Sequence, residues 1–233
     1  MTYHVLSGEV DASHAITLAG STVEMVNGDS IGLSLDNEDL LINTSTVIIA
    51  DVEADNGIIH VIDAVLIPPA EKGEPSMDIV ETAVADGNFT TLVATLQATG
   101  LDAALSDDSV NYTVFAPTDA AFAMIDPATI DILLANTDVL SSILLQHVVD
   151  AEVNSVAAYT LNGASAATLS GANIPVLINS ETDTLTFGGA TIIAKDIYTS
   201  NGIIHVIDTV VIADVEIPDP LGSVVDLSLI HIS

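Results

Sequence analysis

The same eight residues, Asn-Gly-Ile-Ile-His-Val-Ile-Asp, stand at two places in this chain, 56–63 and 201–208. The copies are 145 positions apart (201 − 56), and Tyr3–Val10 also matches Gln146–Val153, at a spacing of 143 (146 − 3). Two additional residues near 180–183, in a polar turn between strand-like runs, would account for the difference. Solenoid repeats are much shorter than this period, so the repeat predicts tandem domains.

The segments that precede the two copies of the repeat differ in length. Residues 76–145 precede the second copy, and the first copy has no counterpart of this segment. We therefore expect the C-terminal half of one module at 1–68, a linker rich in proline and charge at 69–75, and a complete module at 76–215.

The end of the chain has a different character. Residues 216–233 follow the complete module as a tail, and the stretch 227–233 resembles the translated adapter of a sequencing library. We expect 227–233 to be an artefact and the chain to be an internal piece of a longer protein.

The charge of the chain limits its partners. Lys and Arg number 2 against 33 Asp and Glu, which gives a formal net charge of -31. Such a chain repels nucleic acid and anionic membrane surfaces, and no apolar run reaches the ~20 residues of a membrane-spanning helix. We therefore expect no nucleic-acid partner and no direct membrane insertion. Most carboxylates must be solvated, screened by salt or bound to cations, which favours an extracellular or halophilic setting.

Cysteine is absent from the sequence. This excludes disulfides, thiolate metal sites and a cysteine nucleophile. The hydrophobic content of 49% is sufficient to form a core, so the stability of the fold must come from apolar packing.

The pattern of residues changes along the complete module. Helical spacing of apolar residues predicts a helix that begins at Ser76 and ends at Gly87, a second that ends at Gly100, and a third that begins at Asp126 with Pro127 in its first turn. From residue 152 onward, short runs rich in Val, Ile, Leu and Thr alternate with turn residues, which is typical of strands. Helices followed by strands predict an α+β fold.

A specific motif lies between these two regions. Tyr112–Phe115 reads as a buried strand that Pro117 ends, and Thr118 or Asp119 can cap the helical turn that follows. The run Thr-Val-Phe-Ala-Pro-Thr-Asp-Ala-Ala-Phe at 113–122, followed by the octapeptide, resembles the pair of signature motifs of the fasciclin domain family.

A third motif of that family, Tyr-His, also has counterparts here. Tyr3 and His4 keep both of its residues, whereas Gln146 replaces the tyrosine before His147. The resemblance implies an N-terminal helical layer packed on a β-sandwich or wedge of short, mainly antiparallel strands. It also implies a secreted or cell-surface adhesion module without catalysis or cofactor, whose partners are matrix proteins, polysaccharide, other cells or other fasciclin-like modules. Tyr3, His4 and His147 are the binding candidates that it implies.

The octapeptide itself reads as a strand. Alternation places Ile203, His205 and Ile207 on one face, and both faces are mostly apolar, so we expect a central strand buried on both sides. Asn56 and Asn201, each followed by glycine, are expected to form the turns that lead into it. The repeat then specifies the same central strand in each module.

The polar residues of this strand need partners. A buried histidine or aspartate without a hydrogen bond costs about 1–3 kcal/mol, which applies to His60, Asp63, His205 and Asp208. The resemblance implies that Thr118, Asp119 and His147 are the partners in the complete module. The alternative is a metal or catalytic site of His205, Asp208 and His147, but a lone core histidine is usually a satisfied one, so we favour the structural role.

Two further motifs have competing interpretations. Gly-Asp-Ser-Ile-Gly at 28–32 matches the nucleophile elbow of serine hydrolases, but strand-like residues follow where that motif requires a helix, so we expect a turn between strands. Asp36, Glu38 and Asp39 could bind calcium, yet they lack the spacing of an EF-hand, so we expect a solvated turn.

Three functions remain in competition: an adhesion or interaction module, a structural spacer of a surface stalk, and a hydrolase or metal enzyme. We favour the first and expect no enzyme, because no constellation of residues supports catalysis.

Overall fold

The computed structural model describes residues 2–180, 182, 184–213, 215–218 and 224–226. The residues expected to be an artefact, 227–233, lie outside this part, as do two of the residues near the expected insertion. The chain forms two compact units. Unit 1 comprises Met1–Glu71, Val153–Ser165 and Pro175–Thr186, and unit 2 comprises Lys72–Glu152, Ala166–Ile174 and Phe187–Ser233.

The helices are short, and most of them occur between residues 79 and 145. They are η1 (Thr2–His4), α1 (Ala12–Thr17), α2 (Ile79–Asp86), α3 (Thr90–Thr99), α4 (Leu101–Leu105), α5 (Asp119–Ala123), α6 (Pro127–Ala135), α7 (Thr137–Leu145) and α8 (Ser155–Tyr159).

The helix boundaries follow the local signals with one correction. Helix α2 is capped by Asp78 rather than Ser76, because Asp78 forms a reciprocal capping box with Glu81. Gly100 ends α3 with a φ of 72°, and Asp126 caps α6 as expected, with Pro127 in the first position.

The strands of the described part of the chain form three sheets. A five-stranded sheet has the order β1-β2-β3-β4-β5, a seven-stranded sheet has the order β7-β6-β12-β11-β10-β9-β8, and β13 pairs with β14. Their bounds are β1 (Ser21–Glu24), β2 (Ser30–Asp36), β3 (Asp39–Ile42), β4 (Ser45–Ala54), β5 (Gly57–Ile62), β6 (Tyr112–Pro117), β7 (Val148–Val149), β8 (Ala164–Ala167), β9 (Asn173–Asn179), β10 (Thr184–Phe187), β11 (Ala190–Thr199), β12 (Gly202–Ile207), β13 (Glu216–Pro218) and β14 (Val224–Asp226).

The two octapeptides occupy different places in their sheets. In unit 2, β12 lies between β11, to which it is antiparallel, and β6, to which it is parallel, and all of its residues are buried. The predicted central strand is confirmed there. In unit 1, β5 is the last strand of its sheet and is only partly buried, so the prediction of a central strand is wrong for the first copy. The strand that would correspond to β6 is not among the strands of the five-stranded sheet.

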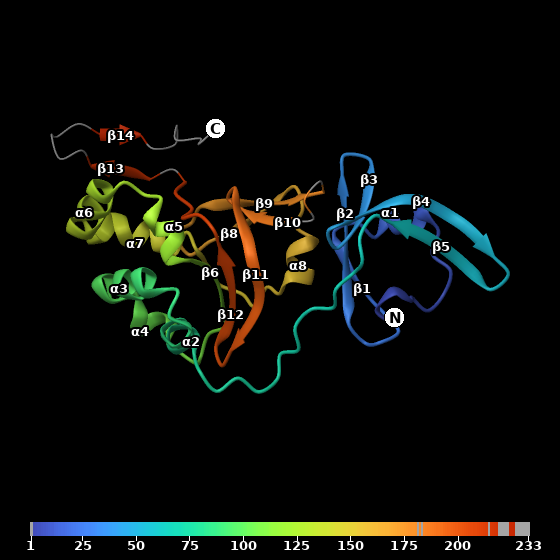
Figure 1. Ribbon diagram of the computed structural model, residues 1–233, viewed down its shortest axis with the longest axis horizontal. Coiled ribbons are helices and arrows are strands. Elements are labelled where there is room, and N and C mark those ends of the chain that lie inside the picture. Colours follow the sequence, from blue (N-terminus) through green and yellow to red (C-terminus); the bar gives the residue numbers. More distant parts are fainter. Residues whose placement is uncertain (1, 181, 183, 214, 219–223, 227–233) are drawn as a thin grey trace. The chain divides into compact units, whose positions relative to one another are not determined.

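The helices α2–α7 cover one face of β6 and β12 (Figure 1). Val114 and Ala116 from β6 and Ile204 and Val206 from β12 pack into one apolar cluster with residues of these helices. The opposite face carries His205 and Phe115, which are neighbours in the parallel register. This layering of helices on a mixed sheet confirms the predicted α+β class.

Unit 1 has a smaller core. Tyr3, Met25, Ile31, Leu33 and Leu66 form its buried apolar cluster. Gly28 and Asp29 lie in the turn between β1 and β2, with Gly28 at a φ of 92°, and the last three residues of the Gly-Asp-Ser-Ile-Gly segment begin β2. The expectation of a turn between strands, rather than a hydrolase elbow, is therefore confirmed.

Within the described part of the chain, no single helix combines the length and apolar composition that a membrane span requires. Helices α6 and α7 reach that composition only when they are taken together, across a break that bends the chain by 106°.

Candidate functional site

The aspartates that end the two octapeptides make the same contact in both units. The amide of Thr46 donates to Oδ1 of Asp63, and the amide of Thr191 donates to Oδ1 of Asp208, in each case over 2.8 Å. Each aspartate also donates its own amide to the carbonyl of the same threonine over 3.1 Å. These bonds fix the start of β4 and of β11 against the end of the repeated strand.

The histidines of the octapeptides lie beside a β-bulge. Asp196 has a positive φ of 60° in β11, and its amide donates to Nδ1 of His205 over 3.2 Å. Asp51 has the same conformation in β4, with a φ of 57°. His60 pairs through Nε2 with the carbonyl of Val10 at 2.8 Å, while its buried Nδ1 has no partner among the described residues.

The partner expected for Asp208 is different from the one observed, and this corrects the prediction. Thr118 accepts from the amide of Ala121 and so caps α5. Asp208 bonds instead to Thr191, at the start of the neighbouring strand of its own hairpin. Each octapeptide therefore has a polar contact at its aspartate, but the partner is a threonine 17 residues earlier in the same hairpin.

Asp119 connects two helices. Its carboxylate accepts from the amide of Thr91 over 2.7 Å and from the amide and hydroxyl of Thr90 over 3.2 and 2.7 Å. Helix α3 has no side-chain cap of its own, so Asp119 from α5 satisfies the amides of its first turn. Partial burial acts to raise the pKa of Asp119, but the bonds from Thr91 and Thr90 outweigh it and lower that pKa.

The Gln-His pair of unit 2 is bonded to the segment that follows β12. The side-chain amide of Gln146 donates to the carbonyl of Ala213 and accepts from its amide over 2.9 Å. Nδ1 of His147 lies 2.8 Å from the carbonyl of Ile143, and Nε2 accepts from the amide of Val211 over 2.9 Å. Gln146, which stands where the family has tyrosine, is thus a buried polar side chain whose hydrogen bonds are satisfied by the backbone of Ala213.

The Tyr-His pair of unit 1 has a related arrangement. The hydroxyl of Tyr3 donates to the carbonyl of Ser30 over 2.9 Å and accepts from Asn43 over 3.1 Å, and the side chain is buried. Nε2 of His4 accepts from the amide of Leu66 over 3.1 Å, as Nε2 of His147 does from its counterpart. Of the three predicted binding residues, only His4 is exposed, and their role in binding stays a prediction.

The buried environment of His147 predicts a pH dependence of stability. Burial lowers the pKa of His147 from its usual 6.5 to about 4, although the bond to Ile143 acts in the opposite direction. The unfolded chain therefore binds a proton between these pH values that the folded chain does not. Above about pH 6.5 the protonation of His147 should not affect the free energy of unfolding. As the pH falls to about 4, it should lower the free energy of unfolding by about 3 kcal/mol in total.

Urea unfolding between about pH 7 and pH 4 measures this effect. We expect His147→Gln to be less stable overall but to have a shallower pH dependence, whereas His14→Gln, on the exposed part of α1, keeps the dependence of the parent chain. A ring NMR signal of His147 that titrates near its usual 6.5 would contradict the assignment.

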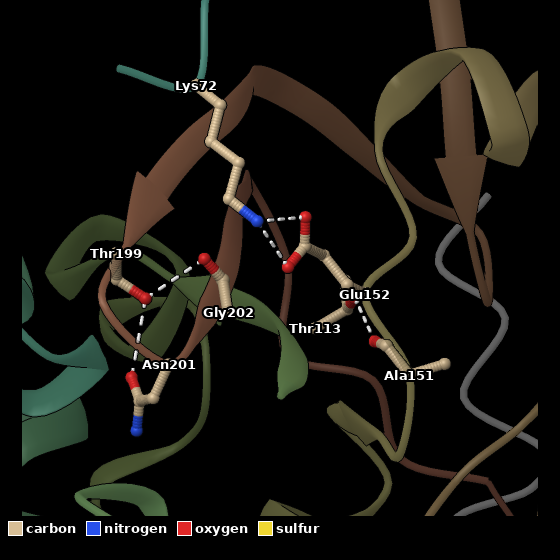
Figure 2. A network of polar contacts seen from close by, with 7 residues as sticks. All are labelled: Lys72, Thr113, Ala151, Glu152, Thr199, Asn201 and Gly202. Carbon is tan, nitrogen blue, oxygen red and sulfur yellow. Dashed lines mark hydrogen bonds and ion pairs between the residues drawn. The ribbon is translucent and has the colours of Figure 1, made fainter. Parts of the chain in front are cut away.

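The side chain of Asn201 is buried at the start of β12, and both of its polar atoms form hydrogen bonds. It is 0% exposed; its Oδ1 accepts from the amide of Ile79 over 3.0 Å, and its Nδ2 donates to the carbonyl of Leu105 over 2.7 Å. The hydroxyl of Thr199 lies 3.0 Å from the carbonyl of Gly202 and 3.4 Å from Oδ1 of Asn201 (Figure 2). Asn56, at the same place in the first octapeptide, is exposed.

The same view includes an ion pair and a hydroxyl contact (Figure 2). Nζ of Lys72 lies 2.6 Å from a carboxylate oxygen of Glu152, and the hydroxyl of Thr113 donates to the carbonyl of Ala151 over 2.6 Å. Lys72 is one of the 2 Lys and Arg residues of the chain, but its side chain is 53% exposed, so the pair contributes about 0–1 kcal/mol.

The acidic turn forms a hairpin. Asp36 pairs with Asp39 across β2 and β3, and Asn37 donates to Asp36 over 3.1 Å at a φ of 55°. Among the described residues, no three His, Asp or Glu side chains come together as a metal site.

Some of these contacts could not be read from the sequence. The bond between Asp119 and α3, the two bonds of Gln146 and the bulges at Asp51 and Asp196 were all missed. Only the last had a signal, since Ile-Ala-Asp-Val at 49–52 has the related Ala-Lys-Asp-Ile at 194–197.

Comparisons with known proteins agree with this fold. The family model of the Fasciclin domain matches residues 1–68 and 87–213. The uncharacterized protein sll1735 of Synechocystis sp. is 39% identical over 135 residues, which cover 58% of this chain and 97% of that protein. Human periostin is 28% identical over 227 residues, which cover 93% of this chain but 25% of periostin.

A solved structure has the same architecture. The FAS1 domain pair of the insect cell adhesion molecule fasciclin I superposes with a TM-score of 0.52 and 18% identity, over 90% of this chain and 77% of the other. Immunogenic protein MPB70 of Mycobacterium bovis is 32% identical over 150 residues, which cover 61% of this chain and 72% of its own. Since the family model accounts for most of the residues and the fold agrees, the chain belongs to the fasciclin domain family.

Proposed function

We propose that this chain is a non-catalytic adhesion or interaction module of a secreted or cell-surface protein. Residues 1–68 correspond to the C-terminal half of one fasciclin module, 69–75 to a linker and 76–215 to a complete module. The domain pair that shares this fold comes from a cell adhesion molecule, which supports an adhesive role.

The observation that carries the proposal is the use of the signature residues. His147, Asp119, Asn201 and Asp208 bond backbone groups of neighbouring elements rather than one another. Polar groups held in this way position helices and strands, whereas a catalytic group needs to face a substrate. Recognition is therefore left to exposed loops, strand edges and helix surfaces.

The helical layer offers one recess for such contacts. A shallow groove of about 210 Å³ lies between α2 and α3, and Val84 and Val93 are among the apolar residues that line it. Val84 is 58% exposed there, so a partner side chain could cover it. The net charge of -31 disfavours a strongly anionic partner and favours a protein or neutral polysaccharide, with calcium as a possible bridge.

A binding panel tests this function. We expect the immobilised full chain to bind at least one matrix protein, polysaccharide or fasciclin module saturably, in high salt, with or without calcium. Val84→Lys should weaken that binding at least about tenfold, because it places a charge in the groove. Ile193→Lys is the matched control, since Ile193 is 57% exposed on β11, a strand rather than a helix of the layer.

A structural spacer is the second candidate, and the charge supports it. A strongly acidic surface keeps repeated domains soluble and apart. The absence of saturable binding by a chain whose circular dichroism shows it to be folded would favour the spacer over the adhesion module.

A further inference from the structure

Strand β2 of unit 1 is covered on both of its faces. Ile31 and Leu33 belong to the buried apolar cluster of the unit. Gly32 and Ser34 alternate with them and therefore lie on the opposite, outer face, and both are buried as well. A strand that is buried on both faces must contact a second layer of the protein on its outer face.

The strand at the same place in the complete module differs on this outer face. β9 corresponds to β2 at the repeat spacing of 143 (173 − 30). Pro175 stands in the position of Gly32 and Leu177 in that of Ser34, and both are exposed. The helices α2–α7 precede β9 in its own module and leave these residues exposed. The cover on the outer face of β2 therefore comes from another part of the chain.

Helix α8 supplies this cover. A Cβ atom added to Gly32 would lie 2.7 Å from the carbonyl oxygen of Val156, 3.0 Å from Cβ of Tyr159 and 3.4 Å from the methyl carbon of Thr160. Val156 and Tyr159 belong to α8, and Thr160 ends it. Gly32 is not among the glycines with a positive φ. The close approach of the helix, rather than the conformation of the strand, is therefore what requires glycine here.

Two polar contacts accompany this packing. Nδ2 of Asn162 donates to the carbonyl of Leu35 in β2 over 3.1 Å, and its Oδ1 accepts from the amide of Ile178 in β9 over 2.8 Å. The hydroxyl of Ser180 donates to the carboxylate of Asp36 over 3.3 Å. The residues that these contacts join to β2 lie 127 and 144 positions later in the chain. Both contacts therefore connect the half-module to the complete module.

We propose that β2 and α8 form a joint between neighbouring fasciclin modules, in which the outer face of β2 in one module is the docking surface for α8 of the next. The modules are then held together by this contact as well as by the linker. The proposal rests on the division into modules at 1–68 and 76–215 given above, and it does not depend on any adhesive partner.

The residues on the two sides of the joint explain its selectivity. Gly32 and Ser34 are small enough to admit the helix, whereas Pro175 and Leu177 of β9 would hold a helix away from the strand. Helix α8 has the sequence Ser-Val-Ala-Ala-Tyr and carries no charge. An uncharged contact suits two modules of a chain whose net charge is -31, because acidic surfaces repel one another.

Cleavage of the linker tests the joint in the absence of the covalent connection. Residues 71–74 are exposed and lie outside helices and strands, so the recognition sequence of a site-specific protease can be inserted between Gly73 and Glu74 of the full chain. After cleavage we expect the two pieces to elute together in size-exclusion chromatography at about 10 μM. Raising the salt from about 0.1 M to about 1 M should not separate them, because none of the contacts named above is an ion pair and salt screens the repulsion between acidic pieces.

Gly32→Val is the first variant of the cleavable chain. Valine suits a strand, and the nearest atoms that its Cβ would meet all belong to residues 156–160, so the change should displace α8 while β2 stays paired with β1 and β3. We expect the affinity between the pieces to fall at least about tenfold. Ala54→Val is the control, since it adds a valine at an exposed position of β4, and it should bind as the parent does.

The second variant leaves the sequence of the half-module unchanged. Asn162→Asp keeps the acceptor for the amide of Ile178 but directs a carboxylate oxygen at the carbonyl of Leu35 in place of a donor. We expect the affinity between the pieces to fall at least about tenfold. A loss of binding in this variant cannot come from misfolding of the half-module, and circular dichroism checks the fold of the complete module.

Three results would overturn the proposal. The first is separation of the two pieces of the parent chain after cleavage. The second is binding as tight as that of the parent in Gly32→Val or in Asn162→Asp. The third is an equal loss of binding in Ala54→Val, which would mean that β2 is not the docking surface. None of these measurements uses an adhesive ligand, so they are independent of the binding panel that tests the proposed function.

Discussion

Replacing Asn201 with alanine is expected to lower the free energy of unfolding of unit 2 by about 3 kcal/mol or more. The side chain is 0% exposed and satisfies the amide of Ile79 and the carbonyl of Leu105. Alanine leaves both backbone groups buried without a partner, at a cost of about 1–3 kcal/mol each. It also removes the connection from α2 and α4 to the start of β12.

The chain supplies its own control for this prediction. Asn56 begins the identical octapeptide but is exposed, so Asn56→Ala should change stability by less than about 0.5 kcal/mol. Urea unfolding, followed by circular dichroism and by amide signals of each unit, measures both variants. Asn201→Asp should cost at least as much as Asn201→Ala at neutral pH, because it buries a carboxylate with one oxygen directed at the carbonyl of Leu105. Similar losses at residues 56 and 201 would show that the buried bonds do not determine the stability.

Replacing Phe115 with alanine should cost about 3–5 kcal/mol. Its side chain is 3% exposed and stacks on Phe187 with an angle of 5° between the ring planes. The substitution removes an aromatic pair and leaves a cavity beside His205, since the surrounding strands can relax only partly.

Thermal and urea unfolding of Phe115→Ala measure this loss. Ile193→Ala is the control on the same sheet, and we expect it to change stability by less than about 0.5 kcal/mol because Ile193 is 57% exposed. A loss below about 1 kcal/mol for Phe115→Ala would mean that β6 can close around the missing ring, contrary to the packing described above.

Much of the fold could be predicted because its signals are local. The octapeptide forms a strand that begins at the glycine after the asparagine, Gly100 ends a helix, and Thr118 caps the helix that contains Phe122. The order of helices and strands predicts the α+β class, and the two signature motifs predict the family. The cap of α2 was misplaced because Ser76 and Asp78 both suit the position, and only Asp78 is reached by Glu81.

The site could be predicted only in part. The sequence predicts hydrogen bonds for the polar residues of the octapeptide, and its aspartates do form them. The partners that were predicted, however, belong to the signature motif at 113–122 and to His147. Asp208 and Asp63 bond to Thr191 and Thr46, which lie 17 residues before them in the same hairpin. The functions of Asp119 and Gln146 depend on which backbone groups come close in three dimensions, and no spacing in the sequence encodes that.

Comparison of the two octapeptides shows which structural properties follow from the sequence alone and which depend on the tertiary structure. Both form the same strand with the same aspartate contact, because the hairpin that makes the contact lies within each copy. Only one of them is a buried central strand, because its second neighbour, β6, comes from a segment about ninety residues earlier in the chain, whereas β5 pairs with β4 alone among the described strands. Burial depends on such distant neighbours, and so eight identical residues become a core strand in one unit and an exposed edge in the other.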